Sequence, residues 1–201
     1  MYLKIKRVFD VVLSIIALVF LSPLIAICML LIYLEDGGAP IFKQIRMGEN
    51  GKPFVIYKLR TMRMNAEDER NSELIKNSNE SDGPAFKIKD DPRITKIGKF
   101  LRKASIDELP QLINILKNEM SIVGPRPALP YEVECYNDYQ RQRLMCKPGL
   151  TCYWQTTSGR NDVLFNEWVE MDLKYINNQS IKEDFLLILK TFKIIFTLDS
   201  R

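Results

Sequence analysis

The sequence VVLSIIALVFLSPLIAICMLLIYL, residues 11–34, decides the architecture of this chain. Of its 24 residues only Ser14, Ser22 and Pro23 are not apolar, and about 18 consecutive apolar residues are enough to predict a membrane helix. A cleaved signal peptide is the competing interpretation, but the stretch is longer than a signal-peptide core and no small-residue cleavage site precedes the acidic pair at 35–36. We therefore expect residues 1–36 to form a membrane-associated helix.

Ser22 and Pro23 interrupt the middle of this segment. Proline removes an N–H donor and crowds the carbonyl four residues earlier, so we expect a bend there, with the Ser22 hydroxyl satisfying a released carbonyl. Three of the 29 Lys and Arg residues precede the segment and the others follow it. The positive-inside preference then favours both ends on the cytoplasmic side, which a re-entrant helix broken at Ser22-Pro23 satisfies. A kinked helix that spans once is the alternative.

The composition narrows the chemistry. The chain has 201 residues and no histidine, which excludes Ser-His-Asp and Cys-His catalysis and histidine-ligated zinc. Its 29 basic and 25 acidic residues leave a net charge of only +4, too little to indicate a nucleic-acid partner. The four cysteines, at 28, 135, 146 and 152, show no CxxC spacing, which favours reduced thiols over disulfides or zinc. Carboxylates, hydroxyls, thiols, Lys and Arg must carry any reaction.

Residues 37–201 are predicted to form one compact α/β domain that is mostly helical. Short β-prone runs around a Gly-containing loop predict a hairpin at 42–57. The acidic stretch 65–83 is typical of a solvated helix or loop, and residues 106–120 carry helical apolar periodicity. The helix expected at 181–198 lies either on the membrane surface or against the core. Its apolar face comprises Phe185, Leu186, Leu189, Phe192, Ile195 and Phe196.

Adjacent carboxylates at Asp107 and Glu108 follow a basic run at 92–103. Ser105 to Glu108 matches a capping box, but Pro110 would then fall inside the helix, so we expect the helix to begin near Asp107. Phosphate is also attracted to such a helix start. Paired carboxylates beside phosphate-binding cations suit phosphoryl transfer through an aspartyl intermediate with Mg²⁺. Capping and surface roles remain the alternative.

Two further segments carry candidate binding residues. GPRP, residues 124–127, holds Arg126 on a stiff backbone that suits bidentate contact with phosphate. KPGLTCYWQTTSGRND, residues 147–162, combines turn residues with Tyr153, Trp154, Gln155 and Arg160. This segment forms either a pocket for a base or sugar or part of the core, and aromatic residues of this kind more often belong to the core.

Together these motifs resemble the bacterial sugar transferase family, of the monotopic phosphoglycosyl transferase (polyprenyl-phosphate hexose-1-phosphate transferase) type. The resemblance rests on KRVFD at 6–10, SP at 22–23, IFKQIRMGENGKPFVIYKLRTM at 41–62, DDPRITKIGKFLRKASIDELPQLINILKNEMSIVGPRP at 90–127 and KPGLTCYWQTTSGRN at 147–161. It implies an N-terminal re-entrant membrane helix (1–36) and a compact α/β catalytic domain (37–201) with interfacial amphipathic helices. The catalytic domain would lie on the cytoplasmic face of the bacterial inner membrane.

The resemblance also implies an activity. It is transfer of a sugar 1-phosphate from a UDP-sugar to undecaprenyl phosphate with release of UMP, the first membrane step in making exopolysaccharide, capsule, O-antigen or a related glycoconjugate. Residues 161–176 resemble members that act on hexoses such as galactose or glucose. Asp107 would be the nucleophile that forms a covalent phosphosugar intermediate, and Glu108, with Asp107, would hold Mg²⁺. Ser22 and Pro23 match the helix-breaking pair. The implied substrate-binding positions are Lys58, Arg102, Gly124, Pro125, Arg126, Gln155, Gly159 and Arg160.

The implied partners are the UDP-sugar, undecaprenyl phosphate and a phospholipid membrane, with no nucleic acid; a homodimer is left open. Cys152 stands where the family commonly has glycine, which puts the local loop geometry in question. A membrane-anchored protein whose basic runs grip anionic lipid is the competing hypothesis. It predicts no UMP release and no effect of Asp107→Asn beyond stability.

Overall fold

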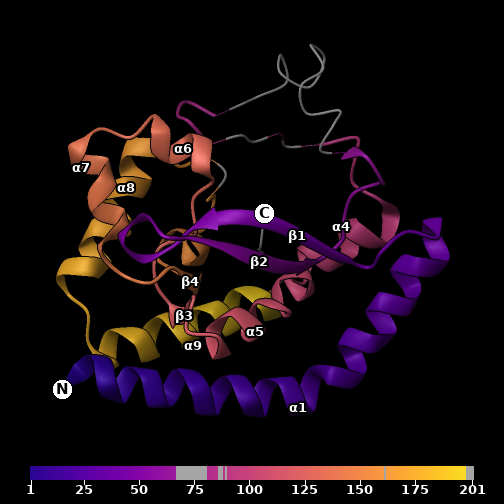
Figure 1. The fold of residues 1–201 in the computed structure, drawn as a ribbon, viewed down its shortest axis with the longest axis horizontal. Helices are drawn as coiled ribbons and strands as arrows, with labels where there is room; N and C mark the ends of the chain where they lie inside the picture. Colours follow the sequence, from indigo (N-terminus) through magenta and orange to yellow (C-terminus); the bar gives the residue numbers. More distant parts are fainter. Residues whose placement is uncertain (67–80, 86–87, 89, 161, 198–201) are drawn as a thin grey trace.

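A computed structural model describes residues 1–66, 81–85, 88, 90–160 and 162–197. Of residues 195–197 it describes the backbone only. The described chain is mostly helical and combines a long N-terminal helix with a small sheet-containing domain, as predicted (Figure 1). The polar stretch predicted at 65–83 falls, from 67 to 80, outside the described residues. In chain order the elements are α1 (Tyr2–Asp36), β1 (Ile41–Met47), η1 (Glu49–Gly51), β2 (Pro53–Leu59), α4 (Lys96–Lys103), η2 (Ile106–Glu108), α5 (Gln111–Leu116), β3 (Ser121–Val123), α6 (Pro130–Glu134), α7 (Asp138–Arg141), η3 (Gln142–Met145), β4 (Gly149–Thr151), η4 (Trp154–Thr156), α8 (Phe165–Asn177) and α9 (Ile181–Thr197), where η marks a 3₁₀ helix.

Helix α1 continues through Pro23 over 35 residues, and Figure 1 shows that it is bent: it runs along the base of the domain and then turns along one side. The Ser22 Oγ donates a hydrogen bond to the carbonyl of Val19 at 3.0 Å. That carbonyl is the one that Pro23 leaves without its N–H donor. The predicted bend and the predicted role of Ser22 are both confirmed. Within the described residues, α1 is the one helix long and apolar enough to cross a membrane.

Both arms of α1 pack against the domain. Ala17 and Leu18 of the first arm contact the apolar cluster of β2 and α5, and Cys28 and Ile32 of the second arm are buried against β2 and α4. Many large apolar side chains of α1 nevertheless stay exposed, and an apolar surface this extensive is typical of a site that contacts lipid or another protein. They are Leu3, Val8, Phe9, Val12, Leu13, Ile15, Ile16, Val19, Phe20, Leu24, Ile27, Leu30, Leu31, Tyr33 and Leu34.

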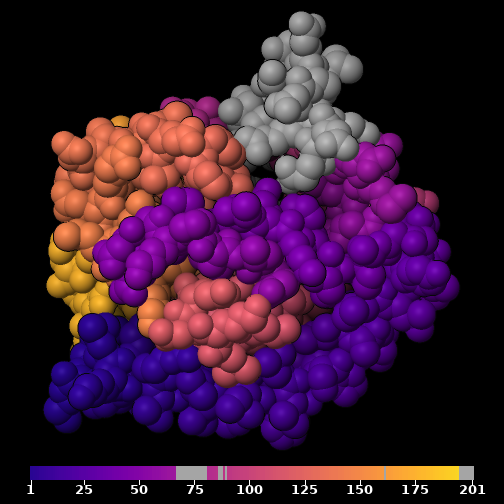
Figure 2. Space-filling model, viewed as in Figure 1, coloured from indigo at the N-terminus to yellow at the C-terminus, as the bar shows by residue number. Residues whose placement is uncertain are grey.

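The hairpin predicted at 42–57 is confirmed. Strands β1 and β2 pair antiparallel, from Ile41 opposite Leu59 to Met47 opposite Pro53. Asn50 and Gly51 turn the chain with positive φ angles of 56° and 70°. The inward side chains of β2 pack on α5, so that α5 lies between the hairpin and α1, as the space-filling view also shows (Figure 2).

A second, parallel pair joins β3 and β4. Gly124, directly after β3, and Gly149, the first residue of β4, bring the two backbone segments very close together. A Cβ added to Gly149 would lie 2.1 Å from the backbone nitrogen of Gly124. Gly124 N donates to the Thr151 carbonyl at 3.0 Å, and Gly149 N donates to the Pro125 carbonyl at 2.8 Å. Glycine is required here because any side chain would separate the two backbones. This contact fixes the direction in which the chain leaves β3 toward Arg126.

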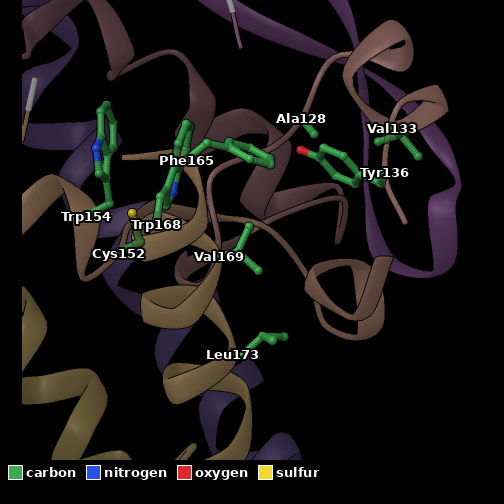
Figure 3. Packing of buried hydrophobic residues seen from close by; sticks show 9 residues of the cluster. All are labelled: Ala128, Val133, Tyr136, Cys152, Trp154, Phe165, Trp168, Val169 and Leu173. Carbon is green, nitrogen blue, oxygen red and sulfur yellow. The ribbon is translucent and has the colours of Figure 1, made fainter. Parts of the chain in front are cut away.

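The main hydrophobic core lies between α8 and the segments on either side of β4 (Figure 3). Trp154 stacks on Trp168 with ring centroids 4.6 Å apart. Behind them, the buried Arg143 guanidinium pairs with Asp172 at 2.7 Å. The expectation that aromatic residues of segment 147–162 belong to the core is therefore confirmed for Trp154. Cys152 is also buried in this cluster, where its side chain fills core space.

The helix predicted over 106–120 is wrong in its bounds. The structure divides this stretch into the single 3₁₀ turn η2 and the six-residue helix α5. Pro110 stands at the N-cap of α5, because it lacks the N–H that a continuous helix would need. Asp107 consequently precedes the helix by a full turn and does not lie at its start.

Helix α9 contacts the domain through a different face from the one predicted to be apolar. Leu187 is completely buried, and the Tyr153 hydroxyl donates to Glu183. Phe185, Leu186, Leu189 and Phe192 of the predicted face are exposed. The side chains at 195 and 196 lie outside the description. The domain therefore does not cover the described part of this apolar face.

Candidate active site

The acidic pair lies in the turn between α4 and α5. Ser105 has a left-handed backbone with φ 55° and makes no side-chain cap, so the capping-box alternative is wrong. The turn carries the Asp107 carboxylate into the domain, where the residue is 8 % exposed. Among the described side chains, none forms a hydrogen bond or an ion pair with this carboxylate. Asp107 is thus a buried carboxylate that no described side chain pairs.

Glu108 joins three segments that are distant in sequence. Its Oε1 accepts a hydrogen bond from Lys58 Nζ of β2 at 2.8 Å, and its Oε2 accepts one from Gln155 Nε2 of η4 at 3.1 Å. The structure therefore brings together Asp107, Glu108, Lys58 and Gln155, four of the residues predicted for the site. The contact is possible because the hairpin delivers Lys58 over the turn η2.

The two carboxylates differ in their electrostatics. Burial raises the pKa of Asp107 to about 6, while the neighbouring Lys58 and Arg102 act to lower it. Burial also acts to raise the pKa of Glu108, but the charge and hydrogen bond of Lys58, together with Arg126, hold this pKa below its usual value. Glu108 is therefore an ionised, paired anchor, and Asp107 is the carboxyl that remains available for chemistry.

Arg102 reaches the site from α4. Its Nε donates to Thr61 Oγ1 at 2.8 Å, which orients the guanidinium beside the acidic turn. Burial lowers the pKa of Arg102, and Asp107 is the strongest charge that opposes this shift. The helix can pass this close to Thr61 because Gly98 faces it, and a Cβ there would lie 2.0 Å from the Thr61 carbonyl oxygen.

Arg126 and Arg160 lie on an aromatic platform. Their guanidinium carbons are 5.4 and 5.5 Å from the ring centroid of Trp154, within the range of a cation–π contact. The Trp154 indole N–H also donates to the Arg160 carbonyl at 2.8 Å. The platform holds both cations close to Glu108, whose pKa they help to lower.

Three of the predicted binding residues act through the backbone. Gly124 provides the close approach to Gly149 described above, and Pro125 accepts the Gly149 hydrogen bond. Gly159 is exposed with φ 66° in the turn before Arg160. These residues shape the loops that carry Arg126 and Arg160, and Ser22 and Pro23 lie apart in α1.

Sequence analysis did not single out two residues of the site, Arg46 of β1 and Gln111 of α5. A pocket beside Glu108 is lined by the polar residues Arg46, Lys58, Glu108, Gln111, Arg126 and Gln155. Both missed residues stand inside quoted motifs, in QIRMG at 44–48 and DELPQ at 107–111. The available signal was an Arg on a strand next to a turn and an amide at the start of a helix, which is too common to be selective.

The site offers two carboxylates as metal ligands, Asp107 and Glu108. Among the described residues no group of three or more His, Cys, Asp or Glu side chains converges. Mg²⁺ is usually held by one or two carboxylates together with substrate phosphates. The two carboxylates are donors of the type that Mg²⁺ takes, and Asp107 is the one that no described side chain pairs.

Comparisons with known proteins agree with one another. The family model described as "Bacterial sugar transferase" matches residues 1–198. The chain is 48% identical to the galactosyl transferase CpsE of Streptococcus agalactiae, over 94% of this chain and 42% of that protein. It is 43% identical to the undecaprenyl-phosphate galactose phosphotransferase of Salmonella typhimurium, over 96% of this chain and 41% of that protein. It is 44% identical to the exopolysaccharide production protein ExoY of Sinorhizobium fredii, over 92% of this chain and 83% of that protein. The chain thus spans about two fifths of the first two relatives and most of the third.

Proposed function

The chain belongs to the bacterial sugar transferase family, and on that premise we propose that it transfers a sugar 1-phosphate from a UDP-sugar to undecaprenyl phosphate and releases UMP. The observation that carries the proposal is the buried Asp107 carboxylate, which lies beside Lys58 and Arg102 and has no partner among the side chains that the structure describes. A carboxylate held in this way, among cations that attract phosphate, is equipped to act as a nucleophile on phosphorus.

The reaction proceeds in two displacements. In the first, an Asp107 carboxylate oxygen bonds to the phosphorus that carries the sugar, the P–O bond to UMP breaks, and the bridging oxygen leaves with its electron pair. In the second, a phosphate oxygen of the lipid acceptor bonds to the same phosphorus and the Asp107–phosphorus bond breaks. Neither step needs a proton donor, which agrees with a chain that has no histidine.

The surrounding residues stabilise charge rather than move protons. Lys58 is held by Glu108 at 2.8 Å, and Arg102 is held by Thr61 at 2.8 Å, so both cations are oriented before the phosphates arrive. Fixed charges of this kind stabilise the anionic transition state without reorganisation. Asp107 and Glu108 would hold Mg²⁺, which when bound supplies further positive charge for the diphosphate.

The names of the relatives support the choice of substrates. Two of them are named for galactose, and one of these also for undecaprenyl phosphate. We therefore assign UDP-galactose as the first donor to test and undecaprenyl phosphate as the acceptor. The exopolysaccharide protein ExoY supports a place in polysaccharide synthesis.

Polar contacts at both ends of α1 support a re-entrant helix. Near its start, Lys6 pairs with Asp184 of α9 at 2.9 Å. At its end, Asp36 pairs with Arg60 at 2.5 Å, and Glu35 accepts hydrogen bonds from the first backbone N–H groups of α4. One domain binds both ends, which supports the proposal that both ends lie on one side of the membrane, and the basic residues favour the cytoplasmic side. The exposed apolar faces of α1 and α9 would then rest in the lipid.

The nucleophile is tested with Asp107→Asn and, as a matched control, the exposed Asp138→Asn. With UDP-galactose and undecaprenyl phosphate, Asp107→Asn should lose on the order of a thousandfold in UMP release, because an amide is a poor nucleophile. Asp138→Asn should retain full turnover. Without acceptor, mass spectrometry should find a hexose-phosphate adduct on Asp107. Near-normal turnover of Asp107→Asn would contradict the assignment.

The topology is tested by labelling single cysteines in sealed vesicles. Lys4, in the first turn of α1, and Ala39, just beyond its end, are both exposed, so Lys4→Cys and Ala39→Cys are suitable in a background in which the exposed Cys135 is replaced by Ser. Gly38 is unsuitable, since a side chain there would meet Arg60 at 2.8 Å. A membrane-impermeant maleimide should label both sites from the same side. Labelling of one site from each side would show that α1 spans the membrane.

A further inference from the structure

The pocket beside Glu108 contains hydrogen-bond donors for which the described residues provide no acceptor. Gln111 is 2 % exposed, and its Nε2 has no acceptor in the part of the chain that the structure describes. A buried amide N–H₂ that lacks an acceptor destabilises the protein, because it has lost its hydrogen bonds to water. A donor kept in this state at the wall of a pocket is suited to an acceptor that arrives with a ligand.

Arg46 adds a second set of donors to the same pocket. The residue is 8 % exposed, and three of its N–H groups are used: two donate to Gln44 Oε1 at 3.0 and 2.7 Å, and one donates to the Pro127 carbonyl at 3.0 Å. A guanidinium has five N–H donors, so two remain. Among the described residues no carboxylate lies within ion-pairing distance of Arg46, although burying a cation without an anion is costly.

Arg126 completes the group. Its guanidinium lies over Trp154 and Trp168, 5.4 and 5.7 Å from their centroids, and it forms no hydrogen bond with the residues that the structure describes. The pocket has one carboxylate in its lining, Glu108, whose oxygens already accept from Lys58 and Gln155. The unused donors and excess positive charge therefore call for an anion with several oxygen acceptors, and phosphate is such a group.

The chemistry of the two displacements says which phosphates are involved. Displacement at phosphorus is in line, so UMP departs on the side opposite Asp107. The acceptor phosphate must later displace Asp107 from that same opposite side. Its attacking oxygen therefore enters where the UMP oxygen left, and one phosphate-binding site can serve both molecules in turn.

We propose that Arg46, Gln111 and Arg126 form a phosphate subsite that first holds the phosphate of the departing UMP and then the phosphate of the lipid acceptor. Arg46 and Gln111 are binding residues in this subsite. The subsite adjoins the Asp107 nucleophile, because Lys58 and Glu108, which neighbour Asp107, line the same pocket. The inference rests on the proposed two-step function, and the assignment of these two residues goes beyond it.

The test uses full-length protein in detergent and two half-reactions. Exchange of labelled UMP into UDP-galactose without acceptor reports on the nucleotide phosphate. Discharge of the pre-formed phosphosugar enzyme by undecaprenyl phosphate reports on the lipid phosphate. The variants are Gln111→Leu and Arg46→Lys, and the matched controls are the exposed Gln142→Leu and Arg141→Lys. The apparent KM for UMP and for undecaprenyl phosphate should each rise about tenfold or more in the two variants, and neither should change in the controls.

Thermal melting separates binding from folding. Gln111→Leu removes no hydrogen bond within the described protein, so its melting temperature without ligand should equal that of wild type or exceed it, while its thermal stabilisation by added UMP should shrink. Both KM values staying within about twofold of wild type would overturn the subsite, and so would an effect in one half-reaction alone. Failure of the wild-type chain to release UMP or form the adduct would instead refute the proposed function.

Discussion

Replacing Asp172 with Asn should destabilise the catalytic domain strongly. The Asp172 and Arg143 side chains are 1 % and 3 % exposed. Arg143 Nε donates to Asp172 Oδ2 at 2.7 Å, and Arg143 Nη1 donates to the Tyr136 hydroxyl at 2.8 Å. Burial raises the pKa of Asp172 to about 6 while Arg143 acts to lower it, so at about pH 7.5 the carboxylate is ionised. Asn would leave the guanidinium buried without a counter-charge.

The expected loss is about 3 kcal/mol. Removing one partner of a buried ion pair costs about 3–5 kcal/mol. The lower end applies because Asp172 Oδ1 makes no hydrogen bond with the residues that the structure describes and an Asn carbonyl can still accept from Arg143. In a chain of this size each kcal/mol corresponds to about 2–4 °C in Tm. We therefore expect Tm to fall by roughly 6–12 °C, measured by intrinsic fluorescence in detergent at a fixed heating rate.

Two further variants isolate the cause. Glu170→Gln changes the same charge on the exposed side of α8, where Tyr139 donates to it, and should alter stability by less than about 0.5 kcal/mol. The double variant Arg143→Met with Asp172→Leu removes both charges and should recover most of the loss, because no charge stays buried alone. If the Asp172→Asn protein had the same Tm as the Glu170→Gln protein, the reasoning would be refuted.

Three other predictions concern thiols, packing and lipid. Burial raises the pKa of Cys146 and Cys152 to about 12, so iodoacetamide at about pH 8 should modify the exposed Cys135 in the native protein well before either of them; equal rates by peptide mass spectrometry would contradict this. Gly149→Ala should lower stability by about 1–3 kcal/mol, measured by melting, since the added Cβ meets Gly124 N at 2.1 Å. Phe185→Ser on the exposed face of α9 should weaken binding to phospholipid vesicles about tenfold, and unchanged flotation would show that this face does not touch lipid.

Much of the fold could be read from local sequence because local rules decide it. The long apolar helix, its interruption at Pro23 and the hairpin around Asn50-Gly51 each follow from a contiguous pattern. The stretch 106–120 was mispredicted because Pro110 was expected in the first turn of one continuous helix that begins near Asp107, whereas in the structure Pro110 is the N-cap of the shorter helix α5. The covalent constraint prevailed over the pattern and moved Asp107 into a separate turn.

The site was harder to predict because its contacts join distant segments. Asp107 and Glu108 are adjacent and follow a basic run at 92–103, which made them candidates. The contacts of Glu108 reach back 50 residues to Lys58 and forward 47 residues to Gln155. Arg46 lies in no distinctive sequence motif. The proposal for it rests on its burial with no carboxylate within ion-pairing distance among the described residues, and only the tertiary structure shows this.

Helix α1 is part of the catalytic domain rather than a tether attached to it. The buried Asp10, in an otherwise apolar environment, accepts a hydrogen bond from Ile122 N of β3 at 3.0 Å, and β3 leads directly to Arg126. Arg7 donates to the last two carbonyls of α5 at 2.6 and 3.0 Å, and α5 follows the turn that holds Asp107. A cation at a helix C-terminus stabilises the free carbonyls there. Helix α1 therefore fixes the end of α5 and the strand β3, the two elements that follow the acidic turn. If α1 enters the lipid, as we propose, these contacts would hold the site at the membrane surface, where a soluble nucleotide-sugar and a lipid-borne phosphate could reach one carboxylate in turn.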